Sequence, residues 1–331
     1  MGAFYLILAI FFFVSCSKGT LAPFDNWAHQ RVQLKDVSIH FRYAGTGPPI
    51  LLVHGNPQHS LTWHTVGPIL AQNYTVIAPD NRGAGDSSIP ANGDYSSATE
   101  AEDLKGVLDL LNITQVYVFS HDKGASFATA LAIKYPSLVK RLGVSENVLP
   151  GFGYESASAP SPSWDLYSNW QLAFFSVTDA AEFFISGKVR EMLSWYFFHT
   201  SYSGMEAISQ DHLNRYTTQI SKPGFLRSCL GPFSNALVAQ DNEFFSATLG
   251  PNPLTIPFLA LAGEASLAPF LQAFWGPVAK NLTAGVVPKA GHWIADENPE
   301  WVAERLLRFF GEDSGISSVD LGWLANKVTL L

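Results

Sequence analysis

Five consecutive residues, Ser120-His121-Asp122-Lys123-Gly124, offer the clearest chemistry in this chain. They follow an apolar run at 116–119 and precede a helix-like stretch that begins at Ala125. Small residues on both sides of a central nucleophile are typical of a sharp turn from strand to helix, which lifts the central side chain above the edge of a sheet. A carboxylate that attacks a saturated carbon forms an ester that water can cleave, so Asp122 predicts epoxides or alkyl halides as substrates. The alternative is that Asp122 only caps the helix.

A histidine near the end of the chain is the expected general base. Gly291-His292-Trp293 follows the apolar-polar run 284–290 and precedes a final helix-like segment at 300–310. On a scaffold with such a turn, the nucleophile, the acid and the histidine follow one another in this chain order. We therefore expect His292 to activate water. Histidines elsewhere lack this placement, for example His64, His199 and His212.

Two glutamates are candidates for the acid that orients His292. Glu146 follows the predicted strand 142–145, and Glu264 follows the predicted strand 258–262. Either strand end could bring a carboxylate to the same imidazole, as a general base requires. We favour Glu146 and keep Glu264 as the alternative acid.

Backbone N–H groups at two turns are the expected oxyanion hole. The segment His54-Gly55-Asn56-Pro57 closes the strand 50–53, and the N–H of Asn56 can point toward the nucleophile. The N–H of Lys123 directly follows the nucleophile, so both groups could stabilise the oxyanion formed when water attacks the ester. The alternative for 54–57 is an ordinary turn. The glycine-containing loop 80–87 lacks the GxGxxG spacing and is predicted to be structural.

The hydrophobic pattern predicts an α/β fold with a doubly wound, mostly parallel sheet. Residues 32–43 alternate apolar and polar side chains, which indicates an antiparallel hairpin with one solvated face. Later segments are mostly apolar on both faces, as parallel strands covered by helices on both sides are. These segments are 50–53, 74–78, 116–119 and 258–262, with helix-like stretches such as 98–111 and 125–135 between them.

A helical cap is predicted to interrupt this core. The alternation of strands and helices stops between 148 and 243, where Gly/Pro/Ser-rich segments lead into aromatic helical stretches such as 191–198. We assign the core to 28–147 and 244–311, the cap to 148–243 and a C-terminal tail to 312–331.

The N-terminal residues predict entry into the secretory pathway. Residues 1–14 are apolar and small residues follow at 15–17, as in a signal peptide. The run is shorter than the roughly 20 residues that span a bilayer. No Lys or Arg precedes it, so an uncleaved membrane anchor over 1–18 is the alternative. Three glycosylation sequons agree with a secreted or lumenal protein, at Asn73, Asn112 and Asn281.

Composition excludes some partners. The formal net charge is −8 and no Lys/Arg run occurs, which argues against nucleic acid. Charged residues are 15% and aromatic residues 13% of the chain, which suits an apolar cavity as well as a core. We expect a small apolar substrate, no cofactor and no catalytic metal.

Cys16 lies in the leader, so Cys229 has no disulfide partner. The sequence does not define an oligomeric state.

Taken together, these motifs resemble the α/β-hydrolase superfamily, in its epoxide hydrolase and dehalogenase branch. The resemblance covers about residues 28–311. The segment 144–153 is similar to epoxide hydrolases whose acid is a glutamate at the earlier strand, and 170–175 resembles their first cap helix. In many relatives an Asp stands three residues after Gly263, where this chain has Ser266. The resemblance implies a cofactor-independent epoxide hydrolase, for example of fungal secondary metabolism, acting on a polyketide-like epoxide.

The cap departs from the pattern of such enzymes. Gln171 stands where a His is often found, and Phe233 stands where a Tyr is expected as the second ring-opening donor. A group that protonates the epoxide oxygen contributes about 10²–10⁴-fold to the rate. Tyr154, Tyr167 or Gln171 could substitute.

Lys123 replaces the Trp of epoxide hydrolases and haloalkane dehalogenases, or the Arg of haloacetate dehalogenases. It could bind an anionic or polar group, or point into solvent. Asn56 resembles the halide-binding Asn of haloalkane dehalogenases. A haloalkane or haloacetate dehalogenase is therefore the first alternative function. A non-hydrolytic ligand-binding or cyclising protein is the second, because the expected donors are missing.

Overall fold

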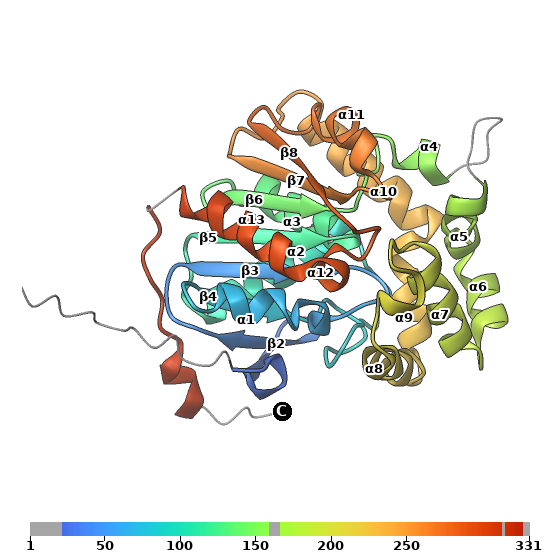
Figure 1. The fold of residues 1–331 in the computed structure, drawn as a ribbon, viewed down its shortest axis with the longest axis horizontal. Helices are drawn as coiled ribbons and strands as arrows, with labels where there is room; N and C mark the ends of the chain where they lie inside the picture. The colour runs from blue at the N-terminus through green and yellow to red at the C-terminus, as the bar shows by residue number, and fades with distance from the viewer. Residues whose placement is uncertain (1–21, 159–165, 313–314, 327–331) are drawn as a thin grey trace, which may run out of the picture.

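The computed structural model describes residues 22–158, 166–312 and 315–326. In these residues eight strands form one sheet in the order β1-β2-β4-β3-β5-β6-β7-β8 (Figure 1). The strands are β1 (Ala28–Gln33), β2 (Ser38–Ala44), β3 (Pro49–Val53), β4 (Thr75–Pro79), β5 (Val116–His121), β6 (Val139–Ser145), β7 (Phe258–Gly263) and β8 (Leu282–Val287). β2 runs antiparallel to β1 and β4, and the remaining neighbours are parallel. This confirms the predicted hairpin and the α/β class.

Helices cover both faces of the sheet, which is why its central strands are apolar on both sides. α1 and α13 pack together on one face, and α2 and α3 pack together on the other. Val302, Leu306 and Phe310 recur every four residues along α13 and are buried. The core helices are α1 (Val66–Leu70), α2 (Ser97–Leu110), α3 (Lys123–Lys134), α11 (Leu271–Trp275), α12 (Ile294–Glu297) and α13 (Pro299–Gly311).

Seven helices lie between β6 and β7 in the described chain, and Figure 1 shows α5 to α9 beyond one end of the strands. They are α4 (Tyr154–Ser158), α5 (Leu166–Ser176), α6 (Thr178–Ile185), α7 (Val189–His199), α8 (Gln210–Ile220), α9 (Phe225–Leu230) and α10 (Asn235–Leu249). Residue 243, where we place the end of the cap, falls inside α10, whose Phe245 and Leu249 join the core cluster. Short 3₁₀ helices are η1 (Phe24–Asn26), η2 (Ser60–Trp63), η3 (Gly204–Glu206), η4 (Gly231–Phe233), η5 (Ala268–Phe270) and η6 (Gly322–Asn326).

The C-terminal tail packs against the core. The N–H of Val319 donates to the carbonyl of Gly47 at 2.8 Å, and Leu321 and Leu324 are buried. The predicted signal peptide or anchor at 1–18 lies outside the described residues. Among the described helices, none is both long and apolar enough to cross a bilayer.

Candidate active site

Asp122 lies at a strained turn between β5 and α3. Its φ of 50° and ψ of −133° are uncommon for a residue with a Cβ. Glycines leave room for this turn: a Cβ on Gly124 would lie 2.3 Å from the carbonyl oxygen of His54, and one on Gly55 would lie 2.4 Å from the Cβ of Asp122. Asp122 occupies the N-cap position of α3, but its side chain makes no capping hydrogen bond of the usual kind.

Three side chains that are distant in sequence meet above the sheet. His292 Nε2 lies 3.5 Å from Asp122 Oδ2, and His292 Nδ1 lies 3.0 Å from Glu146 Oε2. Glu146 follows β6 and also accepts hydrogen bonds from the N–H of Gly263 and the hydroxyl of Ser266, both at 2.7 Å. These contacts fix the carboxylate so that one oxygen faces the imidazole.

Glu264, the alternative acid, does not join this group. It follows β7 as expected, but its side chain is exposed. The strand β7 contributes the backbone N–H of Gly263 to Glu146 instead.

The charges of this group are coupled. Burial opposes the charged imidazole, but the neighbouring carboxylates of Asp122 and Glu146 outweigh it and raise the pKa of His292 to about 9. Burial would raise the pKa of Asp122, but His292 and the N–H of Lys123 lower it below the usual value. The arrangement therefore favours an anionic Asp122 beside a cationic His292.

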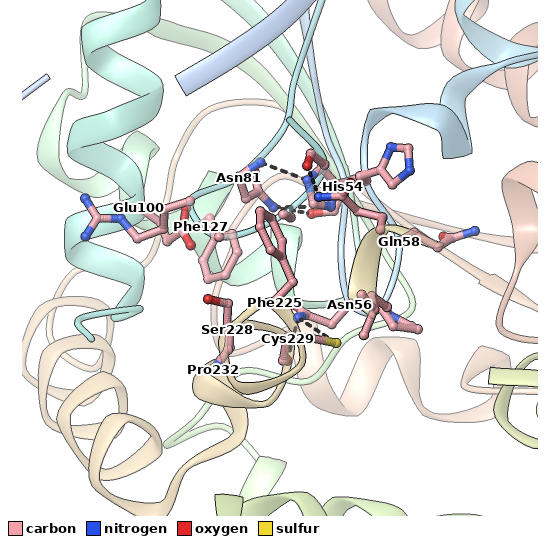
Figure 2. A pocket seen from close by; sticks show the side chains of 18 residues that line it. His54, Asn56, Gln58, Asn81, Glu100, Phe127, Phe225, Ser228, Cys229 and Pro232 are labelled. Atoms are coloured by element: carbon pink, nitrogen blue, oxygen red, sulfur yellow. Dashed lines mark hydrogen bonds between the residues drawn. The ribbon is translucent and has the colours of Figure 1, made fainter. Parts of the chain in front are cut away.

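The two predicted oxyanion-hole groups both face the nucleophile. The N–H of Asn56 donates to Asp122 Oδ1 at 2.8 Å, and the N–H of Lys123 also interacts with this carboxylate. The side-chain amide of Asn56 points away toward α9 and donates to the carbonyl of Cys229 at 2.8 Å (Figure 2).

The backbone of His292 is held from the cap and from the nucleophile turn. Its N–H donates to the carbonyl of Thr200 at 2.8 Å, and its carbonyl lies 2.7 Å from His121 Nε2. A Cβ on Gly291 would lie 2.6 Å from the oxygen of Thr200, so this position requires glycine. His121 was not predicted to have a role, because its position beside the nucleophile does not reveal this contact.

A narrow cavity opens beside Asn56. It contains about 240 Å³ of space between atoms, including some that is open to solvent, and little of it is wide enough for a water molecule. Its lining is mostly apolar and comes from core and cap: Asn56, Pro57, Phe175, Met192, Tyr196, Cys229, Leu230 and Phe233. Cap side chains must therefore move for a substrate to enter.

Tyr196, in α7, has a hydroxyl that the sequence analysis did not identify as a candidate proton donor. It is buried, it lines the cavity, and its ring centre lies 6.4 Å from that of His292. Burial and the nearby Asp122 raise the pKa of Tyr196 well above its ordinary value, so it keeps its proton. In the sequence it stands among other aromatic residues of 191–198, a pattern that indicates packing.

The predicted cap donors have different surroundings. Gln171 is buried in α5, and Tyr154 is buried at the start of α4. The side chain of Tyr167 is outside the described part of the structure. Neither Gln171 nor Tyr154 is among the residues that line the cavity.

The side chain of Lys123 is buried, which overturns the alternative that it points into solvent. Only 4% of the residue is exposed. Its Nζ lies 4.1 Å from the ring centre of Tyr154 and 4.7 Å from that of Phe233, at cation–π distance. Within the described residues no carboxylate lies in ion-pair contact with it.

A second cavity, with about 430 Å³ of space between atoms and open to solvent, lies beside the turn 54–57 (Figure 2). Asp122, His292 and Glu146 are among the lining residues of neither cavity. The wall of the second cavity is held by Asn81, whose N–H donates to His54 Nε2 at 2.8 Å. Asp80 accepts hydrogen bonds from the N–H groups of Ser60 and Asp86, so the loop 80–87 has the structural role expected for it.

Comparison with known proteins agrees with this geometry. The family model described as "alpha/beta hydrolase fold" matches residues 48–299. A soluble epoxide hydrolase from Corynebacterium sp. is 32% identical over 283 residues, which cover 85% of this chain and 96% of the relative. A fluoroacetate dehalogenase from Burkholderia sp. is 28% identical, with 90% of this chain and 98% of the relative covered. The solved structure of the epoxide hydrolase CorEH without ligand superposes with a TM-score of 0.79 at 31% identity, covering 86% and 99% of the two chains.

Proposed function

This chain belongs to the α/β-hydrolase family, and from that premise we propose that it is a cofactor-independent epoxide hydrolase that works through an ester of Asp122. The observation that carries the proposal is the contact of His292 with Asp122 on one side and Glu146 on the other. A carboxylate nucleophile beside an oriented histidine suits attack on a saturated carbon followed by hydrolysis of the ester.

The first step opens the ring. Asp122 Oδ2 attacks an epoxide carbon, the carbon–oxygen bond of the ring breaks, and the departing oxygen takes a proton. Tyr196 is the donor that best supports this step, because it keeps its proton, is close enough to Asp122 for that charge to raise its pKa, and has its ring centre 6.4 Å from that of His292. Donors must lie where charge develops in the transition state.

The second step cleaves the ester. Esterification removes the negative charge of Asp122, so Glu146 is then the one carboxylate of the pair that raises the pKa of His292. The pKa falls, and the imidazole can release its proton. The proton returns to the Tyr196 phenolate. Neutral His292 then removes a proton from water, which attacks the ester carbonyl while the N–H groups of Asn56 and Lys123 stabilise the oxyanion. Collapse releases the diol and restores Asp122.

The substrate class follows from the narrow cavity. Its lining is largely apolar and its free space is small, so a compact epoxide fits with least movement of the cap. A polyketide-sized epoxide would require the cap to open widely.

Trapping of the ester tests the proposal. Full-length His292→Gln protein is incubated separately with small epoxides and matched alkyl halides, and its intact mass is read. A gain equal to the whole epoxide on Asp122 supports ring opening. No adduct from either panel contradicts the proposal and favours a non-hydrolytic binding protein.

A dehalogenase acting on a small halogenated acid is the second candidate, because Lys123 is buried without a carboxylate partner among the described residues. A substrate carboxylate would pair directly with this ammonium, which otherwise interacts with the carboxylate of Asp241 beyond ion-pair distance. The relative named fluoroacetate dehalogenase supports this choice of substrate. Halide release from haloacetates that is lost in Lys123→Met and retained in Lys123→Arg would favour this candidate.

We also propose passage through the secretory pathway. Asn73, Asn112 and Asn281 are all exposed, as glycosylation sites must be. A loss of mass after glycosidase treatment of protein from a eukaryotic host supports this route, and an unmodified mature mass argues against it.

A further inference from the structure

Two histidines and an aspartate from three separate segments meet where the cap contacts the core. His64 follows η2, His212 lies in α8 of the cap, and Asp296 lies in α12. One ligand atom from each lies within 4.8 Å of the others, and the two imidazole ring centres are 4.2 Å apart. None of the three takes part in the proposed hydrolysis.

Each side chain is oriented so that one ligand atom remains available. His64 Nδ1 lies 3.2 Å from the carbonyl of Leu61, and donation to that oxygen leaves Nε2 as a lone-pair donor. Asp296 Oδ2 accepts a hydrogen bond from the side-chain amide of Gln58 at 2.9 Å. Hydrogen bonds of this kind, from the far atom of a ligand to a carbonyl or amide, are typical around metal sites.

The second observation is a buried carboxylate oxygen, Asp296 Oδ1, that accepts no hydrogen bond of normal geometry within the described residues. Its neighbour is Thr62, whose hydroxyl faces Asp296 outside hydrogen-bonding geometry, and the hydroxyl of Tyr216 faces Gln58 in the same way. Buried polar atoms normally have a well-aligned partner, so this oxygen of Asp296 keeps a lone pair available for an ion or a water molecule.

We infer that His64, His212 and Asp296 form a binding site for a divalent transition metal such as zinc. Two imidazole nitrogens and one carboxylate oxygen are a ligand set that zinc, cobalt and nickel accept, with a fourth position left for water. Ligands at about 2.0–2.1 Å from one ion lie roughly 3.3 Å apart, so rotation of the side chains must draw the three atoms together.

A positive charge lies close to the group. Arg215, on the same helix as His212, forms an ion pair with Asp25 at 2.7 Å, which offsets its repulsion of a cation.

A bound ion would link the cap to the catalytic segment. His212 belongs to the cap, whereas Asp296 follows His292 in the segment that begins α12. The ion would hold α8 against this segment and stabilise the closed arrangement. It would not enter the hydrolytic steps.

Metal titration of the full-length protein tests the inference. Protein freed of metals with a chelator is titrated with Co²⁺, followed by visible absorption, and Zn²⁺ binding is measured by equilibrium dialysis. We expect one equivalent of metal to bind, and the visible absorption bands of Co²⁺ to be those of a four-coordinate site with nitrogen and oxygen ligands. The melting temperature should rise with Zn²⁺. His212→Gln and His64→Gln should each weaken binding at least tenfold. His199→Gln, in the neighbouring helix α7, is the matched control and should bind normally.

Two results would overturn the inference. Absence of stoichiometric binding would show that His64, His212 and Asp296 hold no metal ion, and that water is the partner of the buried Asp296 oxygen. Equal binding by wild type, His212→Gln and His64→Gln would place the metal elsewhere. Circular dichroism of each variant shows whether it is folded. Metal binding is read without turnover, so it is independent of the epoxide hydrolase proposal.

Discussion

Replacing Glu146 by Gln removes the negative charge behind His292 and keeps nearly the same side-chain volume. In the free protein, two carboxylates raise the pKa of His292 from 6.5 to about 9, which corresponds to about 3 kcal/mol in favour of the cation. After Asp122 is esterified, Glu146 is the one carboxylate of the pair that still carries charge. Its loss should therefore slow ester hydrolysis by about 10²–10⁴-fold, the range for an oriented general base.

The assay separates the two chemical steps. In a single turnover with excess Glu146→Gln protein, ester formation should proceed within a few-fold of the wild-type rate, because Asp122 keeps its two N–H partners. The ester should then accumulate and be visible in the intact mass. The wild-type protein should show little ester, since its hydrolysis step keeps the base.

Glu264→Gln is the matched control. It makes the same chemical change at an exposed residue that follows β7, the strand next to β6. It should leave both steps unchanged. If Glu146→Gln turned over at the wild-type rate, or if Glu264→Gln also trapped the ester, the assignment of Glu146 as the orienting acid would be refuted.

Four further outcomes are expected. Asp122→Asn should lower the pKa of His292 below about 9, measured by NMR of the ring protons, because one of two supporting carboxylates is gone; an unchanged pKa would contradict the coupling. Because this pKa lies above 6.5 in the folded state, its contribution to stability should be present below pH 6.5 and lost as pH rises through 9. Tyr196→Phe should slow ring opening by about 10²–10⁴-fold while exposed Tyr202→Phe does not, and equal rates would exclude Tyr196 as the donor. Gly124→Ala should destabilise the fold by about 1–3 kcal/mol in urea unfolding, because its Cβ would lie 2.3 Å from a backbone oxygen; unchanged stability would show that the turn relaxes.

The sequence predicted those parts of the molecule that depend on local pattern. The strands β3 and β5 are apolar on both faces because helices cover both sides, so their composition revealed the parallel sheet. The turn at Asp122 was readable because its geometry demands small neighbours at fixed spacing. The structure brings Asp122, His292 and Glu146 together, and their catalytic roles stay predictions.

The cap was far less predictable. Whether an aromatic residue on a cap helix contributes to packing or to the active site depends on which face of the helix is directed at the core. The repeated aromatic residues around Tyr196 do not show which face that is. Burial of Lys123 between Tyr154 and Phe233 depends on α4 and η4 folding back over the nucleophile turn, a long-range contact that spacing does not reveal. The meeting of His64, His212 and Asp296 is of the same kind.

The order of the site along the chain has a consequence during synthesis. Asp122 and Glu146 belong to one strand-helix-strand unit, whereas His292 follows Glu146 by 146 residues, beyond the whole cap. Domains generally fold as units, and β7 and β8 belong to the same sheet as β5, so the core that positions Asp122 is complete only when the C-terminal part has been synthesised. On the proposed mechanism, a chain that ends before 292 would also lack the base that cleaves the ester. Turnover therefore depends on the last part of the chain to be made.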